Sequence, residues 1–363
     1  MKGTAKTVAA LSVLALLSAA CSSSSSGGSP PSAPAAASFK ACMVTDTGGI
    51  DDKSFNQSSW EGMQAAQAAE PSKIKAQYLP SASPADYAKN ISAFTAQKCG
   101  IIVTVGFLMG TATQQAAKAN PSQKFAIVDF SYNPSLSNVD ALVFNTVQDG
   151  FLGGYLAAGL TKTGKVATFG GEQFGTVTIY EDGFWDGVQY YNSKHHTHVQ
   201  VLGWSEPAQK GTFAGSFTDL SAGQRIANTF ITEGADVIFP VAGGVGLGSA
   251  KAVQAANSAG KHVKMMWVDT DGCISAAAYC KFFVTSVEKG ITVAVKTAVL
   301  AAANGSFKGG NFIGTLSNGG VTLAPYAHSG FPSQVPAALA SEVAQVQMLI
   351  ESNKIVPKTK SPV

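Results

Sequence analysis

Three side chains suited to ligand binding stand where one predicted strand gives way to a predicted helix. They are Asp46, Phe55 and Asn56: a hydrogen-bond acceptor, a flat ring and an amide that both donates and accepts. The apolar run 41–45 predicts the strand, and Ser54 followed by Gln57 is a capping-box pattern that predicts the helix start. Ligands of open α/β sheets bind at the carboxyl ends of strands, so we expect a binding site here. The alternative for Phe55 is core packing beside Trp60.

Polar groups also follow two more predicted strands. Gly106 follows the run 101–105, and Asp129 follows the run 125–128. The Asp129 carboxylate is suited to accept hydrogen bonds from ring N–H groups, contacts that give selectivity. The alternative is that Asp129 caps a turn formed with Ser131 and Asn133.

An acid and a lysine end the strands predicted further along the chain. Asp269 accepts hydrogen bonds from neighbouring hydroxyls and Lys289 donates to a hydroxyl oxygen, so the two predict a sugar clamp, with Asp271 in reserve. A calcium loop is the rival interpretation of Asp269 and Asp271. It is disfavoured because the oxygen-rich run that a calcium ion needs stops at Gly272.

A second aromatic group and a glycine-rich loop complete the candidates. The predicted helix 177–187 carries two aromatic residues, Tyr180 and Phe184, and Phe184 lies one turn deeper and is better suited to the core. The loop 242–249 contains Gly243 and Gly244, which let backbone N–H groups approach a ligand closely. The loop is not a phosphate-binding P-loop, because no lysine follows Gly248.

The segment 51–62 resembles a known family. Asp-Asp-Lys-Ser-Phe-Asn-Gln followed by Trp-Glu-Gly is similar to the basic membrane protein (purine nucleoside receptor A, PnrA-like) family, and the resemblance continues at intervals to about residue 330. It implies a substrate-binding component of an ABC transporter, with two lobes closing on a nucleoside.

The resemblance also implies roles for particular residues. Phe55 would stack on the base, and Tyr180, where the family usually has phenylalanine, would cover the opposite face. Asp129 would contact the base, and Asp269 with Lys289 would hold the ribose. The implied partners are a purine nucleoside (adenosine, guanosine or inosine) and an ABC permease, and no cofactor is expected.

Alternating strand and helix patterns run through the body of the chain and predict an α/β fold with parallel sheets. We expect a periplasmic-binding-protein type I-like arrangement of two doubly wound lobes joined by a hinge. The first lobe comprises 39–148 plus about 288–318, where 288–303 is predicted to be a returning helix. The second lobe comprises 149–287 plus part of the C-terminal tail.

The first residues carry the features of an export signal. Lys2 and Lys6 precede an apolar run that is too short to span a bilayer, and small residues lead to Cys21. This predicts a signal peptide over 1–20, lipidation of Cys21 as a membrane anchor, and an extracytoplasmic location. The uncharged Ser, Gly, Pro and Ala composition of 21–38 predicts a tether.

The other four cysteines suit an oxidising compartment. Two disulfides are predicted, Cys42–Cys99 between neighbouring strands and Cys273–Cys280 at short range, while buried free thiols are the alternative. A metal site is disfavoured because no Cys-x-x-Cys spacing occurs in the sequence. The histidines His195, His196 and His198 are expected to face solvent.

Composition narrows the function further. A formal net charge of +3 on 363 residues offers no field that would attract nucleic acid. The sequence contains no Gly-x-Ser-x-Gly elbow and no nucleophile with an obvious base, so we expect a binding protein and not an enzyme. We also expect the protein to be a monomer. Two alternatives remain open: the same fold binding a free sugar or sugar-like signal, or a surface lipoprotein that binds another protein.

Overall fold

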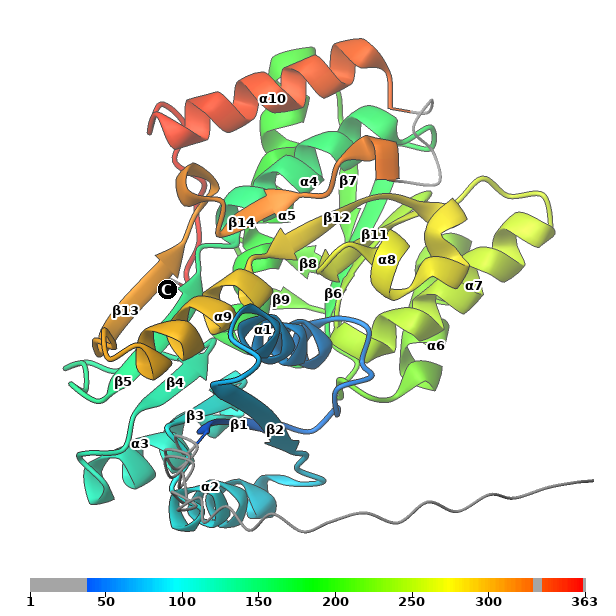
Figure 1. The fold of residues 1–363 in the computed structure, drawn as a ribbon. Helices are drawn as coiled ribbons and strands as arrows, with labels where there is room; N and C mark the ends of the chain where they lie inside the picture. The colour runs from blue at the N-terminus through cyan, green and yellow to red at the C-terminus, as the bar shows by residue number, and fades with distance from the viewer. Residues whose placement is uncertain (1–37, 329–334, 362–363) are drawn as a thin grey trace, which may run out of the picture. The chain divides into compact units, whose positions relative to one another are not determined.

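A computed structural model describes residues 38–328 and 335–361, and two parallel sheets dominate it (Figure 1). The first sheet has six strands in the order β13-β5-β4-β3-β1-β2, all paired in parallel. These strands are β1 (Phe39–Thr45), β2 (Ile74–Leu79), β3 (Ile101–Val105), β4 (Phe125–Val128), β5 (Val139–Phe144) and β13 (Gly310–Gly314).

The second sheet also has six strands, in the order β14-β12-β11-β10-β6-β7. They are β6 (Lys165–Gly170), β7 (Gln200–Leu202), β10 (Val237–Val241), β11 (Lys264–Asp269), β12 (Phe283–Lys289) and β14 (Val321–Leu323). Only β14 is antiparallel, where it pairs with β12. A separate two-stranded ribbon joins β8 (Trp204–Ser205) to β9 (Lys210–Gly211).

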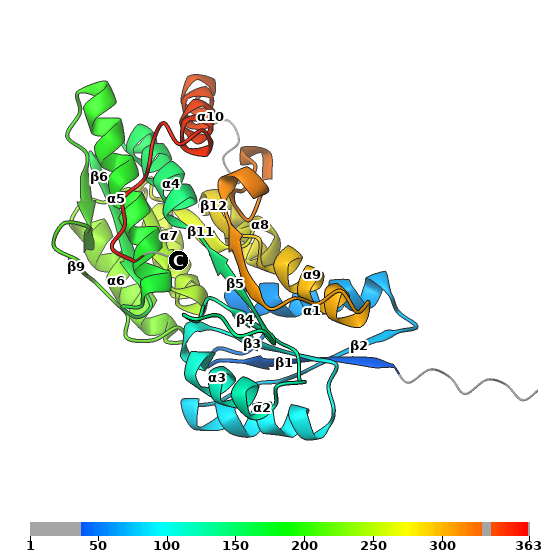
Figure 2. The same cartoon turned by 90° about the vertical axis from the view of Figure 1, so that its left-hand side faces the viewer.

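Helices cover both faces of each sheet (Figures 1 and 2). On the first sheet, α2 (Tyr87–Ala96) and α3 (Gly110–Ala119) lie on one face, and α1 (Phe55–Ala69) and α9 (Ile291–Ala303) on the other. On the second sheet, α4 (Val147–Leu160) and α5 (Gly175–His195) form one layer, and α6 (Leu220–Thr232) and α7 (Gly246–Ser258) the other. Because both faces are covered, the central strands β3, β4 and β10 are buried along their whole length, as their unbroken apolar runs require.

Glycines allow α4 and α5 to pack in close contact. A Cβ atom on Gly154 would lie 2.0 Å from the Phe184 carbonyl oxygen, and one on Gly187 would lie 2.0 Å from the Phe151 carbonyl oxygen. Neither position therefore accepts a side chain unless the helices separate. This packing fixes the position of Tyr180, which α5 carries to the carboxyl end of the sheet.

Two further α-helices, one of four residues and one of 15, lie outside these layers. The helix α8 (Gly272–Ser275) follows β11, and α10 (Ala337–Glu351) packs on α4. None of the helices within 38–328 and 335–361 is both long and apolar enough to cross a bilayer.

The structure confirms several predictions and corrects others. Both disulfides are formed, Cys42–Cys99 with Cα atoms 6.0 Å apart and Cys273–Cys280 with Cα atoms 4.5 Å apart. The helix expected from residue 288 begins instead at Ile291, because Glu288 and Lys289 continue β12. The lobe boundaries stay a prediction, and the predicted leader, Cys21 and the tether up to residue 37 lie outside the described residues.

Candidate ligand-binding site

A cavity of about 660 Å³ lies at the carboxyl ends of the strands of both sheets. All of the principal candidates named from the sequence lie on its wall: Asp46, Phe55, Asn56, Gly106, Asp129, Tyr180, Gly243, Gly244, Asp269 and Lys289. The residues come from the ends of β1, β3, β4, β10, β11 and β12 and from the starts of α1 and α5. Parallel topology gathers them, because every strand of a parallel sheet ends on the same edge.

The start of α1 is capped differently from the prediction. The Asp52 carboxylate accepts the backbone N–H groups of Ser54 (3.0 Å), Asn56 (2.8 Å) and Gln57 (3.0 Å). The predicted capping box at Ser54 is therefore wrong, because the Asp52 carboxyl group already accepts hydrogen bonds from the free N–H groups of the first turn. The Ser54 hydroxyl is released for another contact.

That contact joins the β1–α1 loop to the second sheet. The Ser54 Oγ atom lies 2.7 Å from Asp269 Oδ2 and 3.1 Å from the Val268 carbonyl oxygen, and all three groups are buried. Close by, the Trp267 indole N–H donates to the Lys53 carbonyl oxygen at 3.0 Å. Asp52, which lines the cavity, and Ser54, which contacts Asp269, were not predicted from the sequence because both have the residue types of an ordinary helix start.

Asp46 forms a polar corner of the cavity. Asn56 Nδ2 donates to Asp46 Oδ1 at 2.9 Å. Burial raises the pKa of Asp46 to about 7, although the hydrogen bond from Asn56 opposes the shift. Gly106 is required beside it: its φ is 113°, and a Cβ atom there would lie 2.2 Å from Asp46 Oδ2.

Lys289 lies between two carboxylates at the centre of the cavity. Its Nζ atom is 2.5 Å from Asp129 Oδ2 and 3.8 Å from Asp269 Oδ1, and its side chain is 4% exposed. Burial opposes the ammonium charge, but Asp129 and Asp269 outweigh it and hold the pKa of Lys289 above its ordinary value. Asp129 and Asp269 both adopt left-handed backbone conformations, with φ of 64° and 67°, at the ends of their strands. Asp129 therefore forms an ion pair with Lys289 and does not cap a turn with Ser131 and Asn133, which was the alternative interpretation.

Two aromatic rings flank the same ammonium group. Lys289 Nζ lies 5.3 Å from the centre of the Phe55 ring and 5.2 Å from the centre of the Tyr180 ring. The Tyr180 hydroxyl donates to Asp269 Oδ1 at 3.2 Å, which holds the ring in place. Phe55 is only partly buried, so it is available to a ligand and is not lost to the core.

A stack of three further rings lines the cavity and was not predicted. Phe107 stacks on Phe174 with centres 5.3 Å apart, and Phe174 stacks on Phe217 at 6.3 Å. Phe107 could have been found from the sequence because it follows Gly106 at a strand end. Phe217 lies in an irregular loop, where no periodic pattern marks it.

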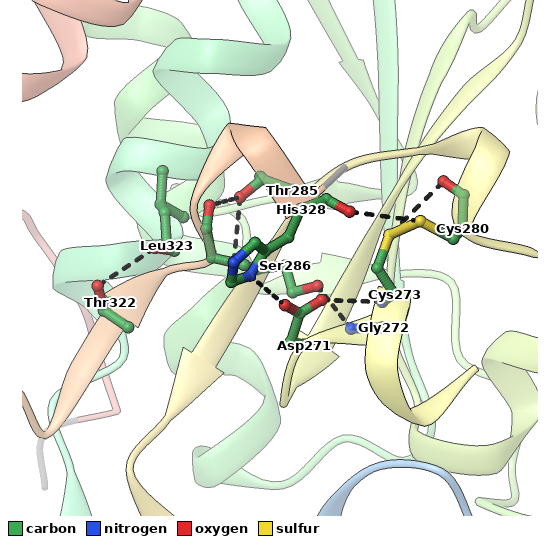
Figure 3. A network of polar contacts seen from close by, with 10 residues as sticks. Asp271, Gly272, Cys273, Cys280, Thr285, Ser286, Thr322, Leu323 and His328 are labelled. Atoms are coloured by element: carbon green, nitrogen blue, oxygen red, sulfur yellow. Dashed lines mark hydrogen bonds and ion pairs between the residues drawn. A yellow bond between two sulfur atoms is a disulfide. The ribbon is translucent and has the colours of Figure 1, made fainter. Parts of the chain in front are cut away.

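The two reserve candidates lie away from this cavity. Phe184 is fully buried in the core, with its ring 5.6 Å from that of Phe239. Asp271 caps α8 by accepting the backbone N–H of Cys273 (2.8 Å) and pairs with His328 Nδ1 at 3.0 Å (Figure 3). Asp271 is therefore employed in holding a local turn, and the ribose contact expected of it is not supported.

The histidine cluster was also only partly understood from the sequence. His195 does not simply face solvent: its Nε2 atom lies 2.8 Å from Glu342 Oε2 on α10 and 3.1 Å from the Tyr155 hydroxyl on α4. It links α5 to α10. Within the part of the chain that the structure describes, no cluster of three or more His, Cys, Asp or Glu side chains is arranged to hold a metal ion.

Comparison with known proteins identifies the family. Residues 39–363 match the family model described as "ABC transporter substrate-binding protein PnrA-like". The chain belongs to this family. It is 33% identical over 298 residues to the "ABC transporter nucleoside-binding protein BmpA" of Lactococcus lactis subsp. cremoris, covering 78% of this chain and 81% of the relative. It is also 33% identical over 291 residues to the "CD4+ T-cell-stimulating antigen" of Listeria monocytogenes, covering 77% of this chain and 78% of that protein.

A solved structure shares the fold. The solute-binding protein of an ABC transporter system from Aeropyrum pernix K1 superimposes with a TM-score of 0.78 at 24% sequence identity, covering 88% of this chain and 94% of that one. The predicted fold, two parallel-sheet domains of the periplasmic-binding-protein type, is confirmed. The protein is an ABC transporter substrate-binding protein, and its family consists of extracytoplasmic binding proteins and not of enzymes.

Proposed function

We propose that the cavity binds a purine nucleoside (adenosine, guanosine or inosine), which the protein delivers to an ABC permease. One observation carries the proposal: a single cavity presents flat rings, carboxylate acceptors and a charge-balanced lysine. A nucleoside needs each of these, since it has an uncharged heterocycle, N–H donors on the base and vicinal hydroxyls on the sugar. The nucleoside-binding relative from L. lactis supports the same ligand class.

The base would contact the aromatic side of the cavity. Phe55 is placed to stack on it, a contact that contributes about 1–3 kcal/mol, and Tyr180 is placed on the other side of the same ammonium group. Asp46 and Asp129 would accept hydrogen bonds from the base edge. Buried acceptors of this kind discriminate strongly against ligands that leave them unpaired.

The sugar would contact the charged cluster. Asp269 accepts from hydroxyl groups, and Lys289 donates to a hydroxyl oxygen at the same point. Phosphorylated nucleotides should bind poorly, because Lys289 is already paired with Asp129 and Asp269, whose carboxylates would repel a phosphate in this buried setting.

Ligand capture would proceed by closure of the two lobes about a hinge. The contacts of Ser54 and Trp267 connect the β1–α1 loop with β11, and in this proposal they form when the lobes close. Closure would bury the ligand and create the surface that the permease recognises. The lobes proposed are 39–148 plus about 288–318, and 149–287 plus part of the tail.

A thermal-shift screen followed by calorimetry tests the ligand class. Adenosine, guanosine and inosine are compared with adenine, ribose and AMP at equal concentration. A nucleoside present at about 100 times its Kd should stabilise the fold by about 2.7 kcal/mol, whereas ribose and AMP should have little effect. Equal stabilisation by ribose alone, or no shift with any nucleoside, would refute the proposal.

We also propose that the protein is exported, that residues 1–20 are removed, and that a lipid on Cys21 anchors it while 21–38 acts as a tether. The test is cell fractionation of the full chain and of Cys21→Ala, with palmitate labelling. The native protein should incorporate label and fractionate with membranes, while the variant should do neither. Label in the variant would place the lipid elsewhere.

A further inference from the structure

A second chamber of about 560 Å³ adjoins the cavity. The two spaces share Phe107, Asp129, Thr176 and Lys289, so the Asp129–Lys289 ion pair stands at their junction. An additional group carried at this point by a ligand in the first cavity would therefore lie next to the second space.

The chamber is mainly apolar. Its inner wall is formed by Phe130, Val143, Phe144 and Ile179, and the last three of these are at least 95% buried. Hydroxyl groups of Ser131, Thr176 and Ser361 complete the lining. Among the described residues that line it, the only charged ones are Asp129 and Lys289, which form an ion pair at 2.5 Å. An apolar, uncharged substituent fits this lining, while a phosphate would find no free cation there.

Ser361 lines the chamber, and the C-terminal segment 358–361 to which it belongs is held on α5 by hydrogen bonds. The Thr359 hydroxyl (2.8 Å) and the Lys360 N–H (3.1 Å) both donate to Asp182 Oδ2, while the Lys358 N–H donates to Asp186 at 2.6 Å. Asp182 is itself fully buried. Ser361 is thereby fixed with its Oγ atom 2.7 Å from the Thr178 hydroxyl.

Gly175 and Ser361 meet on the chamber wall, at a point that we call its mouth. Gly175, the first residue of α5, lines the chamber, and a Cβ atom there would meet only Ser361, at 3.6 Å. The backbone therefore tolerates a side chain at this position, and a large one would lie against Ser361 on the chamber wall. Neither Gly175 nor Ser361 lines the first cavity.

From this geometry we infer that the second chamber is a subsite for an uncharged apolar substituent on the ligand, so that the protein accepts nucleosides extended by an alkyl or aryl group. The inference rests on the proposed function, since it assumes a nucleoside in the first cavity. It widens the proposed substrate class to extended nucleosides. It also assigns the limit on ligand size to the part of the wall that is formed by α5 and the C-terminal segment.

The test measures the affinity of the full protein for adenosine, for N6-benzyladenosine and for 5′-deoxy-5′-isobutylthioadenosine by calorimetry. The first extended probe carries an uncharged apolar group on the base, and the second carries one on the sugar. At least one of them should bind within tenfold of adenosine. In Gly175→Phe, which obstructs the mouth, that probe should bind at least tenfold more weakly, while adenosine changes less than twofold.

Matched variants separate obstruction from damage to the fold. Gly175→Ala should leave both affinities unchanged, and Ser361→Phe, at the opposite side of the mouth, should reproduce the selective loss even if Gly175→Phe folds poorly. The inference is overturned if adenosine binds but both probes are more than tenfold weaker, or if neither obstructing variant affects the extended probe selectively. Failure of adenosine, guanosine and inosine alike to bind would instead reject the proposed function.

Discussion

Replacing Ser54 by alanine should weaken ligand binding more than it weakens folding. The Ser54 hydroxyl has a single proton, shared between Asp269 Oδ2 at 2.7 Å and the Val268 carbonyl oxygen at 3.1 Å. It therefore contributes one full hydrogen bond to a charged acceptor, worth about 1.5–3 kcal/mol. The bond joins the β1–α1 loop to β11, so under the proposed hinge closure it forms only in the closed state.

The loss should appear as a change in affinity. If the ligand binds the closed form, a bond that exists only in that form adds its free energy to binding. At about 1.4 kcal/mol per factor of ten, Ser54→Ala should raise Kd by about 10- to 150-fold. Binding should not be abolished, because the Trp267 contact to the Lys53 carbonyl oxygen still joins the two sides.

A neighbouring serine provides the control. The Ser58 hydroxyl is also buried on α1, but it donates at 2.7 Å to the Ser54 carbonyl oxygen within its own helix. Ser58→Ala should therefore leave Kd nearly unchanged. Titration calorimetry with the preferred nucleoside gives Kd, and thermal unfolding without ligand checks the fold. The reasoning is refuted if Ser54→Ala binds within threefold of the native protein, or if Ser58→Ala loses as much.

Three other predictions follow from the same structure. Phe55→Ala should weaken nucleoside binding about 5- to 150-fold, as expected for loss of a stacking contact of about 1–3 kcal/mol, while free ribose still fails to compete; an unchanged Kd would show that the ring does not meet the base. Because burial raises the pKa of Asp46 from 3.8 to about 7, the folded state keeps a proton that the unfolded chain releases, so the free energy of unfolding should fall as pH rises from about 4 to 7. Asp46→Asn should flatten this part of the profile of melting temperature against pH, and identical slopes would exclude Asp46 as its source. Removing the Cys42–Cys99 disulfide, which links residues 57 apart, should cost about 4 kcal/mol in denaturant unfolding, whereas removing the short-range disulfide should cost about 2–3 kcal/mol; the reverse order would contradict the loop-entropy reasoning.

Much of the site could be predicted because parallel topology is strongly encoded in the chain. Apolar runs such as 101–105 and 125–128 had to be buried strands, and the residues after them had to share one edge of a sheet. Asp129 and Lys289 could therefore be assigned to one site although 160 residues separate them along the chain. Local pattern and topology were sufficient for that inference.

Contacts that depend on how the two halves meet could not be predicted. Ser54 fits a capping box by type and spacing, yet Asp52 takes that role and leaves Ser54 to bond across the cavity. Asp271 fits a sugar ligand equally well by position, yet it caps α8 and pairs with His328 (Figure 3). In each case the residue type and its position in the chain fit two different hydrogen-bond partners. Only the distances in the folded structure show which partner is bound.

The sequence by itself determined the two-sheet fold, the family, the disulfide pairs and the edge at which the ligand cavity forms, because burial periodicity and strand-end position are local properties of the chain. The tertiary structure alone decided that Lys289 is clamped between Asp129 and Asp269, that Phe107, Phe174 and Phe217 stack, and that the C-terminal segment walls a second chamber. These features depend on side chains from distant segments meeting within a few ångströms, and such meetings are fixed only when all the elements pack at once.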